Sequence, residues 1–194
     1  MNTLSNQNAP MATLAPIAAG SIINQGALAL FGSWALAALS QVAVGAPVEM
    51  TLQTFGVLLI GLTFGARLAF ASIAAYLIQG AMGLPVFSAG DGGLVYLFGP
   101  TGGYLFGFLF AATLIGFLAD RGLTRSWLGT IIALLAGTAV IYALGLPWLG
   151  SIFGYDKMLE YGFTPFVLGD TIKLVLAALI GKGVLKGAST FARL

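Results

Sequence analysis

Long apolar runs, each close to the length of a membrane-spanning helix, make up most of this sequence, and charged residues fall almost entirely between them. Only 7% of the 194 residues are Asp, Glu, Lys or Arg, whereas an ordinary soluble domain carries about 25%. Hydrophobic residues reach 59%, and no long polar stretch follows the first ten residues. We therefore predict one integral membrane domain.

Gly, Pro and charged residues divide the apolar sequence into six expected helices, since a span needs about 20 residues. Their ranges are 26–44, 50–64, 68–82, 101–119, 127–148 and 166–184. The second and third are short for a full crossing and are separated by a break at 65–67. Residues 1–25 form a partly polar tail, in which 11–23 could lie at the membrane surface, and residues 26–194 form the domain. The predicted fold is an all-α bundle of six transmembrane helices.

Basic residues predict the orientation, because Lys and Arg accumulate in cytoplasmic loops whereas acidic residues carry little signal. If both termini are cytoplasmic, six basic residues face inward and only Lys157 faces outward. The six are Arg67, Arg121, Arg125, Lys182, Lys186 and Arg193. A seventh helix would scramble this separation. We expect both termini to be cytoplasmic, with the chain in the cell (inner) membrane.

The residue types that are missing exclude several function classes. The sequence has no Cys and no His, which removes Cys and His metal sites, Cys nucleophiles and Ser–His catalysis. Its few basic residues form no run that could follow a nucleic-acid backbone. It contains no GxxxxGK[ST] phosphate-binding loop, so it cannot hydrolyse ATP by that route. We expect no metal, no cofactor, no nucleic-acid partner and no enzymatic activity.

Asp170 and Lys173 are unusual because they lie inside the last apolar run. Residues three apart share a helix face, and in a helix entered from the outer side Asp170 would lie about 8 Å deep. Ionisable groups inside a membrane are costly unless they face protein, water or a ligand. The pair predicts a polar ligand site loaded from outside. A structural ion pair that closes on itself is the alternative.

The connection between the third and fourth helices is rich in glycine and is predicted to form an extracytoplasmic lid. Its glycines at 90, 92, 93, 99, 102 and 103 permit positive φ and close approach. Non-helical backbone at membrane depth needs shelter from protein or a water-filled cavity. Phe87, Tyr96 and Tyr104 could wall a ligand there, with Asp91 as a further contact. An ordinary turn with tyrosines at the membrane interface is the alternative.

Two further features lie on the first two helices. Gln53 is a candidate ligand contact, because its amide can both donate and accept. Ala29, Ser33 and Ala37 form a stripe of small residues, whose spacing of four permits close helix approach. Such stripes usually pack within one chain. The functional interpretation is a face on which a partner membrane protein docks.

Three sequence blocks resemble the BioY family, the substrate-binding S components of biotin transporters of the energy-coupling-factor type. They are TLQTFGVLL at 51–59, GLPVF followed by GGLVYLFGPTGGYLFGF within 83–108, and GDTIKLVLAA at 169–178. The resemblance covers nearly everything from about Gly26 to Val184. It implies a six-helix fold, biotin as the bound substrate, and a partner module of two cytoplasmic ATPases and a membrane coupling protein.

The resemblance also implies roles for individual residues. The family's acid and lysine in the sixth helix map onto Asp170 and Lys173. Asp170 would accept the ureido N–H groups of biotin, and Lys173 would either donate to the ligand or hold Asp170 ionised. Gln53 and Tyr104 are plausible extra donors.

Other functions remain open at this point. The nearest is an S component for another vitamin, since the architecture recurs with different pockets. A solitary ion-coupled transporter would need further intramembrane acids or histidines. An intramembrane enzyme would have only one acid and one lysine as its catalytic set. Whether the chain works without an energising module is also open.

Overall fold

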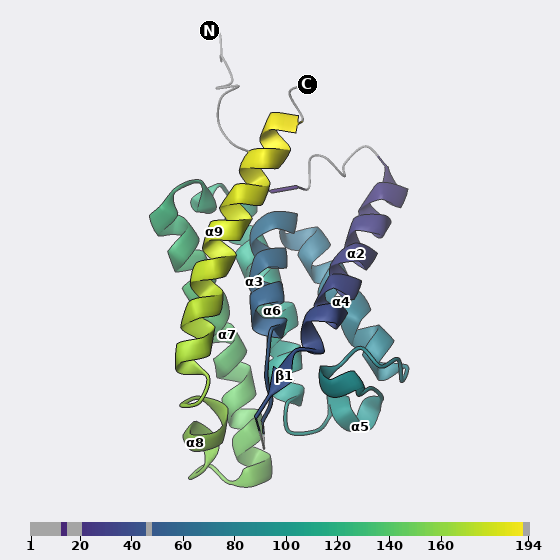
Figure 1. The fold of residues 1–194 in the computed structure, drawn as a ribbon, viewed down its shortest axis with the longest axis vertical. Helices are drawn as coiled ribbons and strands as arrows, with labels where there is room; N and C mark the ends of the chain where they lie inside the picture. The colour runs from purple at the N-terminus through teal and green to yellow at the C-terminus, as the bar shows by residue number, and fades with distance from the viewer. Residues whose placement is uncertain (1–12, 15–20, 46–47, 192–194) are drawn as a thin grey trace, which may run out of the picture.

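The computed structural model describes residues 13–14, 21–45 and 48–191, and within them the fold is almost entirely helical. Figure 1 shows the long helices packed side by side as one bundle. The six longest are α2 (Ile22–Ser40), α3 (Gln53–Phe64), α4 (Ala66–Ala81), α6 (Gly102–Asp120), α7 (Trp127–Phe153) and α9 (Val167–Phe191). The shorter elements are η1 (Ser88–Gly90), α5 (Leu94–Leu97), η2 (Leu123–Arg125) and α8 (Met158–Gly162).

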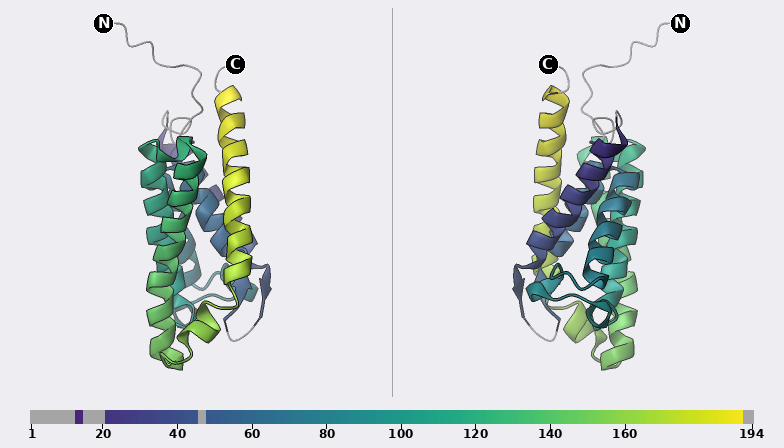
Figure 2. Two further views of the ribbon diagram at one scale, coloured as in Figure 1. Left: turned by 90° about the vertical axis from the view of Figure 1, so that its left-hand side faces the viewer. Right: turned by 90° about the vertical axis from the view of Figure 1, so that its right-hand side faces the viewer.

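Four segments of the described chain are long and apolar enough to cross a membrane. They are α2, α6, α7 and the run 158–190 that contains α9. Helices α3 and α4 are apolar but shorter, at 12 and 16 residues. The start of α2 and the end of α9 lie at the same end of the bundle, and the opposite end carries α5 and α8 (Figures 1 and 2).

The break between α3 and α4 is confirmed and centres on Gly65. This residue has φ +79°, a backbone conformation that residues with a Cβ atom rarely adopt. The first amide of α4, on Ala66, donates to the Asp120 carboxylate at 2.9 Å. Asp120 therefore caps α4 from the end of α6 and joins the two helices at this corner.

The first predicted helix is too long at its carboxyl end, because α2 stops at Ser40. Residues Ala43–Val44 (β1) pair instead with Met50–Thr51 (β2) as a short antiparallel ladder. Strands of two residues carry no readable alternation, so the all-α prediction missed this hairpin. The Ser40 hydroxyl donates to the carbonyl of Val86 at 2.7 Å, which ties the end of α2 to the loop at 83–100.

The helices at the other end of the chain also differ from prediction. Helix α7 runs on through Pro147 and ends at Phe153, where Gly154 adopts φ +95°. Helix α9 extends to Phe191 rather than 184, and α8 was not expected. Most of the proposed interfacial stretch at 11–23 lies outside the described residues; within it, the Leu14 amide donates to the Thr63 carbonyl at 2.6 Å.

The small-residue stripe on α2 is covered by the same chain. Ala29, Ser33 and Ala37 are at most 8% exposed, and the Ser33 hydroxyl donates to Gln79 of α4 at 2.8 Å. Any side chain at Gly32 on the same face would meet Ser72. Because α4 already occupies that face, the stripe is not open to a partner protein in this structure.

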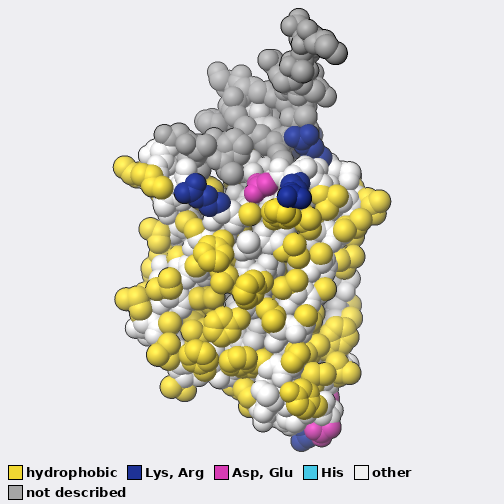
Figure 3. Space-filling view, turned by 180° about the vertical axis from the view of Figure 1, so that it is seen from behind, with side chains coloured by type: hydrophobic (Ala, Val, Ile, Leu, Met, Phe, Trp, Pro, Cys, Tyr) yellow, Lys and Arg dark blue, Asp and Glu magenta, His cyan; other side chains and the backbone are white. Residues whose placement is uncertain are grey.

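Charge separates the two ends of the bundle. Figure 3 shows apolar side chains over most of the face between the ends, with Lys and Arg gathered at the end where α9 finishes. Lys182 lies there and donates to the carbonyls of Thr124 and Arg125, at 2.5 and 2.7 Å. A broad apolar belt, with basic residues gathered beyond one end of it, is typical of a multi-pass membrane protein.

Candidate ligand-binding site

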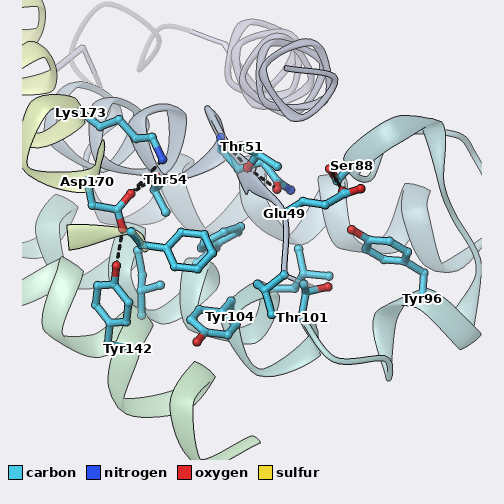
Figure 4. Close-up of a pocket in the computed structure, with 16 residues that line it drawn as sticks. Glu49, Thr51, Thr54, Ser88, Tyr96, Thr101, Tyr104, Tyr142, Asp170 and Lys173 are labelled. Atoms are coloured by element: carbon cyan, nitrogen blue, oxygen red, sulfur yellow. Dashed lines mark hydrogen bonds and ion pairs between the residues drawn. The ribbon is translucent and has the colours of Figure 1, made fainter. Parts of the chain in front are cut away.

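A cavity opens between the helices on the side where the hairpin and the 83–100 loop lie (Figure 4). Its walls come from α3, α6, α7 and α9. The lining residues are Val48, Glu49, Thr51, Gln53, Thr54, Ser88, Tyr96, Thr101, Tyr104, Leu105, Phe108, Ile141, Tyr142, Phe166, Asp170 and Lys173. Such a cavity, mainly apolar with a few converging polar groups, is typical of small-molecule sites.

Asp170 is the centre of the polar groups at one end of this cavity. Its carboxylate accepts from the Lys173 ammonium at 2.8 Å, the Thr54 hydroxyl at 3.1 Å and the Tyr142 hydroxyl at 2.6 Å. The donors come from α9, α3 and α7, and Asp170 itself is 9% exposed. A carboxylate in the first turn of a helix is also favoured by the positive end of the helix dipole. We call these four residues the Asp170 cluster.

Lys173 lies one turn further into α9 on the same face, as its spacing from Asp170 predicts. Its side chain is 7% exposed, and no second ion pair occurs in the part of the chain that the structure describes. Both members of the pair line the cavity rather than the outer surface. The sequence predicts that the two charged side chains project from the same face of the helix, and in the structure both line the cavity. They also form an ion pair with each other, as the alternative interpretation expects.

Gln53 lies at the start of α3 and lines the cavity, but its amide is already hydrogen-bonded within the protein. It donates to the Tyr76 hydroxyl at 2.6 Å and accepts from Thr51 at 2.7 Å. The Thr51 hydroxyl also accepts from the Gln53 backbone amide at 3.1 Å. In this arrangement Gln53 stabilises the wall of the cavity and joins α3 to α4.

Tyr104 of α6 also lines the cavity, where its ring forms part of the wall while its hydroxyl is hydrogen-bonded within the protein. The hydroxyl donates to the carbonyl of Gly162 at 2.9 Å, which holds α8 against the bundle. The ring meets Tyr142 edge-on, with centroids 6.3 Å apart, and Tyr142 meets Phe163 in the same way at 5.1 Å. Together these rings form an aromatic wall beside Asp170.

A second polar group lies at the other end of the cavity (Figure 4). The Ser88 hydroxyl donates to the Glu49 carboxylate, which joins the hairpin to the 83–100 loop. Tyr96 and Thr101 complete this end. Burial raises the pKa of the Tyr96 hydroxyl, so that it lies even further above neutral pH.

The 83–100 loop places its other two predicted contacts away from the cavity. Phe87 is fully buried and stacks behind Tyr96, with ring centroids 5.1 Å apart. Asp91 is exposed and lines a separate outer pocket with Glu49 and Tyr96. Phe87 therefore packs behind Tyr96 without lining the cavity, and Asp91 lies outside the cavity. The positive φ expected for the loop glycines is found at Gly90 and Gly93.

Most of the lining residues were not predicted as site residues, among them Tyr142, Thr54 and Glu49. Tyr142 lies in the middle of an apolar run, and nothing in the sequence marks it as the partner of a residue 28 positions away. Thr54 lies next to Gln53 in an otherwise apolar run, and nothing in the sequence places its hydroxyl against Asp170. The place of Glu49 in the cavity depends on the hairpin.

Comparison with known proteins identifies the family. A sequence profile described as the BioY family matches residues 7–190. The chain belongs to the BioY family. The resemblance inferred from the three sequence blocks is thereby confirmed, and each block contributes to the cavity: Thr51 and Gln53 from the first, Tyr96 and Phe108 from the second, Asp170 from the third.

BioY relatives from distant organisms share most of the chain. The biotin transporter BioY of Thermotoga maritima is 42% identical over 156 residues, which cover 79% of this chain and 87% of that protein. A probable biotin transporter BioY of Pyrococcus horikoshii is 40% identical and covers 70% of this chain and 80% of its own length. The crystal structure of an S component for biotin from an energy-coupling-factor-type ABC transporter matches with a TM-score of 0.75 and 29% identity, covering 84% of this chain and 90% of that one.

Proposed function

We propose that this protein is the biotin-specific S component of an uptake transporter, which captures biotin from the outer side of the membrane and delivers it inward. The observation that carries the proposal is the Asp170 cluster, a buried polar group at one end of the cavity in a chain of the BioY family. The protein would act as a transporter subunit and not as an enzyme. Biotin would be cargo, and no cofactor is required.

Biotin matches the chemistry of this cavity. Its fused ureido ring presents two N–H donors and one carbonyl acceptor, and its thiolane ring and carbon chain need apolar walls. Asp170 would accept one ureido N–H group, and Leu105, Phe108 and Ile141 offer the apolar wall. A hydrogen bond to a charged group contributes roughly 1.5–3 kcal/mol, so a few of them together with apolar burial support tight binding.

The occupancy of Asp170 suggests what Lys173 does. A carboxylate offers about four lone-pair positions, and three of them already face Lys173, Thr54 and Tyr142. The two N–H groups of a five-membered cyclic urea point to opposite sides of the ring, so Asp170 accepts from one of them and its remaining position suffices. An ammonium has three donors, and Lys173 uses one of them on Asp170. We propose that Lys173 donates another to the ureido carbonyl while it stays paired with Asp170.

We propose that six helices span the membrane, with both termini cytoplasmic and the 83–100 loop acting as a lid on the outer side. The basic end of the bundle supports this orientation. The membrane would be the inner, or cell, membrane. Helices α3 and α4 are too short to cross the whole membrane by themselves. The hairpin and the lid, at their outer ends, would fill the rest of the membrane thickness.

Energy for transport would come from a separate module, because the sequence contains no phosphate-binding loop of the GxxxxGK[ST] type. We propose two cytoplasmic ATPases and a membrane coupling protein as the partners. Since α4 covers Ala29, Ser33 and Ala37, the coupling protein would have to dock on another face.

Calorimetric titration of the purified protein in detergent with biotin, thiamine and riboflavin tests the proposed function. We expect saturable one-to-one binding of biotin with a Kd below the micromolar range, and no heat of binding from the other two vitamins. Tight binding of another vitamin in place of biotin would contradict the assignment of substrate. Absence of binding to biotin would contradict the proposal as a whole.

A further inference from the structure

The 83–100 loop is tied to the helix bundle at both of its ends. Near its start, the Ser40 hydroxyl at the end of α2 donates to the carbonyl of Val86 at 2.7 Å. At its far end, the indole N–H group of Trp148 in α7 donates to the carbonyl of Gly99 at 2.9 Å. Trp148 therefore joins the last part of the loop to α7.

The ring of Trp148 packs against the same end of the loop. Phe98 stacks against it with ring centroids 6.3 Å apart. Phe106 of α6 lies 6.0 Å from the Trp148 ring and 6.1 Å from the Phe98 ring. Aromatic rings at such separations attract one another beyond the effect of apolar burial. The three rings connect the loop, α6 and α7, and none of the three lines the cavity.

Two glycines at the start of α6 make room for Trp148. A side chain at Gly102 would meet the Trp148 ring at 3.1 Å, and one at Gly103 would meet the Cβ atom of Trp148. Neither glycine has a positive φ, so the close approach of Trp148 explains them and an unusual backbone conformation does not. The lack of side chains here allows Trp148 to reach the Gly99 carbonyl.

The end of the loop that Trp148 holds borders the mouth of the cavity. Tyr96 and Thr101 lie on either side of Gly99 in the sequence, and both line the cavity. Together with Gly99, they also line the outer pocket. A shift of Gly99 away from Trp148 would therefore move two lining residues and widen the mouth.

We propose that Trp148 is a positioning residue for ligand retention, which keeps the end of the lid against the cavity and so slows the escape of bound biotin. The inference rests on the proposed function and adds to it a residue that does not line the ligand cavity. Gly99 is half-buried, and a carbonyl that loses its partner in such a place is costly. The indole N–H group and the stacked rings therefore stabilise the closed lid.

The rate at which biotin leaves the purified protein in detergent tests the proposal, measured by chasing radiolabelled biotin with unlabelled biotin. Trp148→Phe keeps an aromatic ring but removes the N–H donor. We expect biotin to dissociate about three- to tenfold faster from this variant than from the native protein, because the closed lid loses one hydrogen bond. The association rate should change by less than about twofold.

A matched control and the choice of readout separate positioning from stability. Trp34→Phe makes the same chemical change at an exposed position of α2, and it should leave the dissociation rate unchanged. Dissociation is observed only on molecules that have bound biotin. A variant that is merely less stable would therefore show fewer binding sites at the native rate, whereas loss of positioning changes the rate itself.

A second variant approaches the same contact from the lid. Phe98 is exposed, so Phe98→Leu should leave the fold intact while it removes the ring that stacks on Trp148. We expect dissociation about two- to fivefold faster than native. Phe110→Leu, at an exposed position of α6, is the matched control and should release biotin at the native rate.

The outcomes distinguish this proposal from the proposed function. Native dissociation from Trp148→Phe would overturn the role of Trp148 while the biotin assignment stands. If that variant binds no biotin, Phe98→Leu decides the question by the same criterion. Equal acceleration in the control variants would also overturn the role, since the effect would not be specific to this contact. If the native protein binds no biotin, the proposed function fails and this inference fails with it.

Discussion

Asp170 receives hydrogen bonds from residues on three different helices, and this makes it the residue on which the account depends most. Thr54 belongs to α3, Tyr142 to α7 and Lys173 to α9 itself. The pair Asp170–Lys173 could be predicted from the sequence, because charges in an apolar run are rare. Tyr142 and Thr54 could not, because only the packing of α3 and α7 against α9 brings them to the carboxylate.

Replacing Asp170 by Asn should weaken biotin binding by about 10- to 100-fold, since it removes the charge from hydrogen bonds that are each worth roughly 1.5–3 kcal/mol. Asn keeps the size and part of the hydrogen bonding, but it leaves the buried Lys173 ammonium unpaired, which should lower the stability by about 3–5 kcal/mol. The melting temperature in detergent therefore has to show that the variant is folded at the temperature of the titration. Calorimetry against the native protein measures the change, with Asp156→Asn as a control. Affinity within twofold of native would contradict the assignment.

A double substitution separates the structural from the ligand-binding role of the pair. Lys173→Met alone leaves a buried carboxylate uncompensated, which should cost about 3–5 kcal/mol of stability. Adding Asp170→Asn should recover most of that loss, seen as a restored melting temperature in detergent, but biotin binding should stay impaired. If binding returned with stability, the pair would be structural only.

At the scale of elements, helix boundaries were predictable where glycine or charge marks them. The break at Gly65 was expected, and α6 begins and ends within one residue of its predicted range. The hairpin was not predictable, because β1 and β2 have two residues each and form only through their pairing. The cavity mouth depends on that hairpin, and so the place of Glu49 in the cavity also required the structure.

The covered face of α2 gives a stability prediction with a control on the same helix. A side chain at Gly32 would meet Ser72 and Phe64, whereas one at Gly26 meets nothing within 4 Å. Gly32→Val should therefore destabilise the protein by about 1–3 kcal/mol through overpacking. Thermal unfolding of Gly32→Val and of the control Gly26→Val in detergent tests this. Equal melting temperatures would show that α2 does not pack on α4 as described.

At the scale of the whole molecule, an apolar belt separates a basic end from an end that carries the cavity mouth. This division was readable from the sequence, because it follows from which connections hold Lys and Arg. It makes the proposed direction of transport physically consistent, since the lid and the Asp170 cluster would then face the side from which the vitamin arrives.

Single cysteines test this orientation, and the chain has no native Cys to interfere. Asp91 and Arg121 are both exposed and lie in connections predicted to face opposite sides of the membrane. A membrane-impermeant maleimide applied to intact cells should label Asp91→Cys and leave Arg121→Cys unmodified until the cells are opened. Labelling of Arg121→Cys alone would reverse the orientation.

The structure of the protein determined in the presence of biotin tests the central claim most directly. The account predicts the bicyclic ring in the cavity between α3, α6, α7 and α9, with a ureido nitrogen within hydrogen-bond distance of the Asp170 carboxylate and the chain pointing toward Glu49. Biotin bound at another place, with the Asp170 cluster unchanged and its cavity empty, would contradict it.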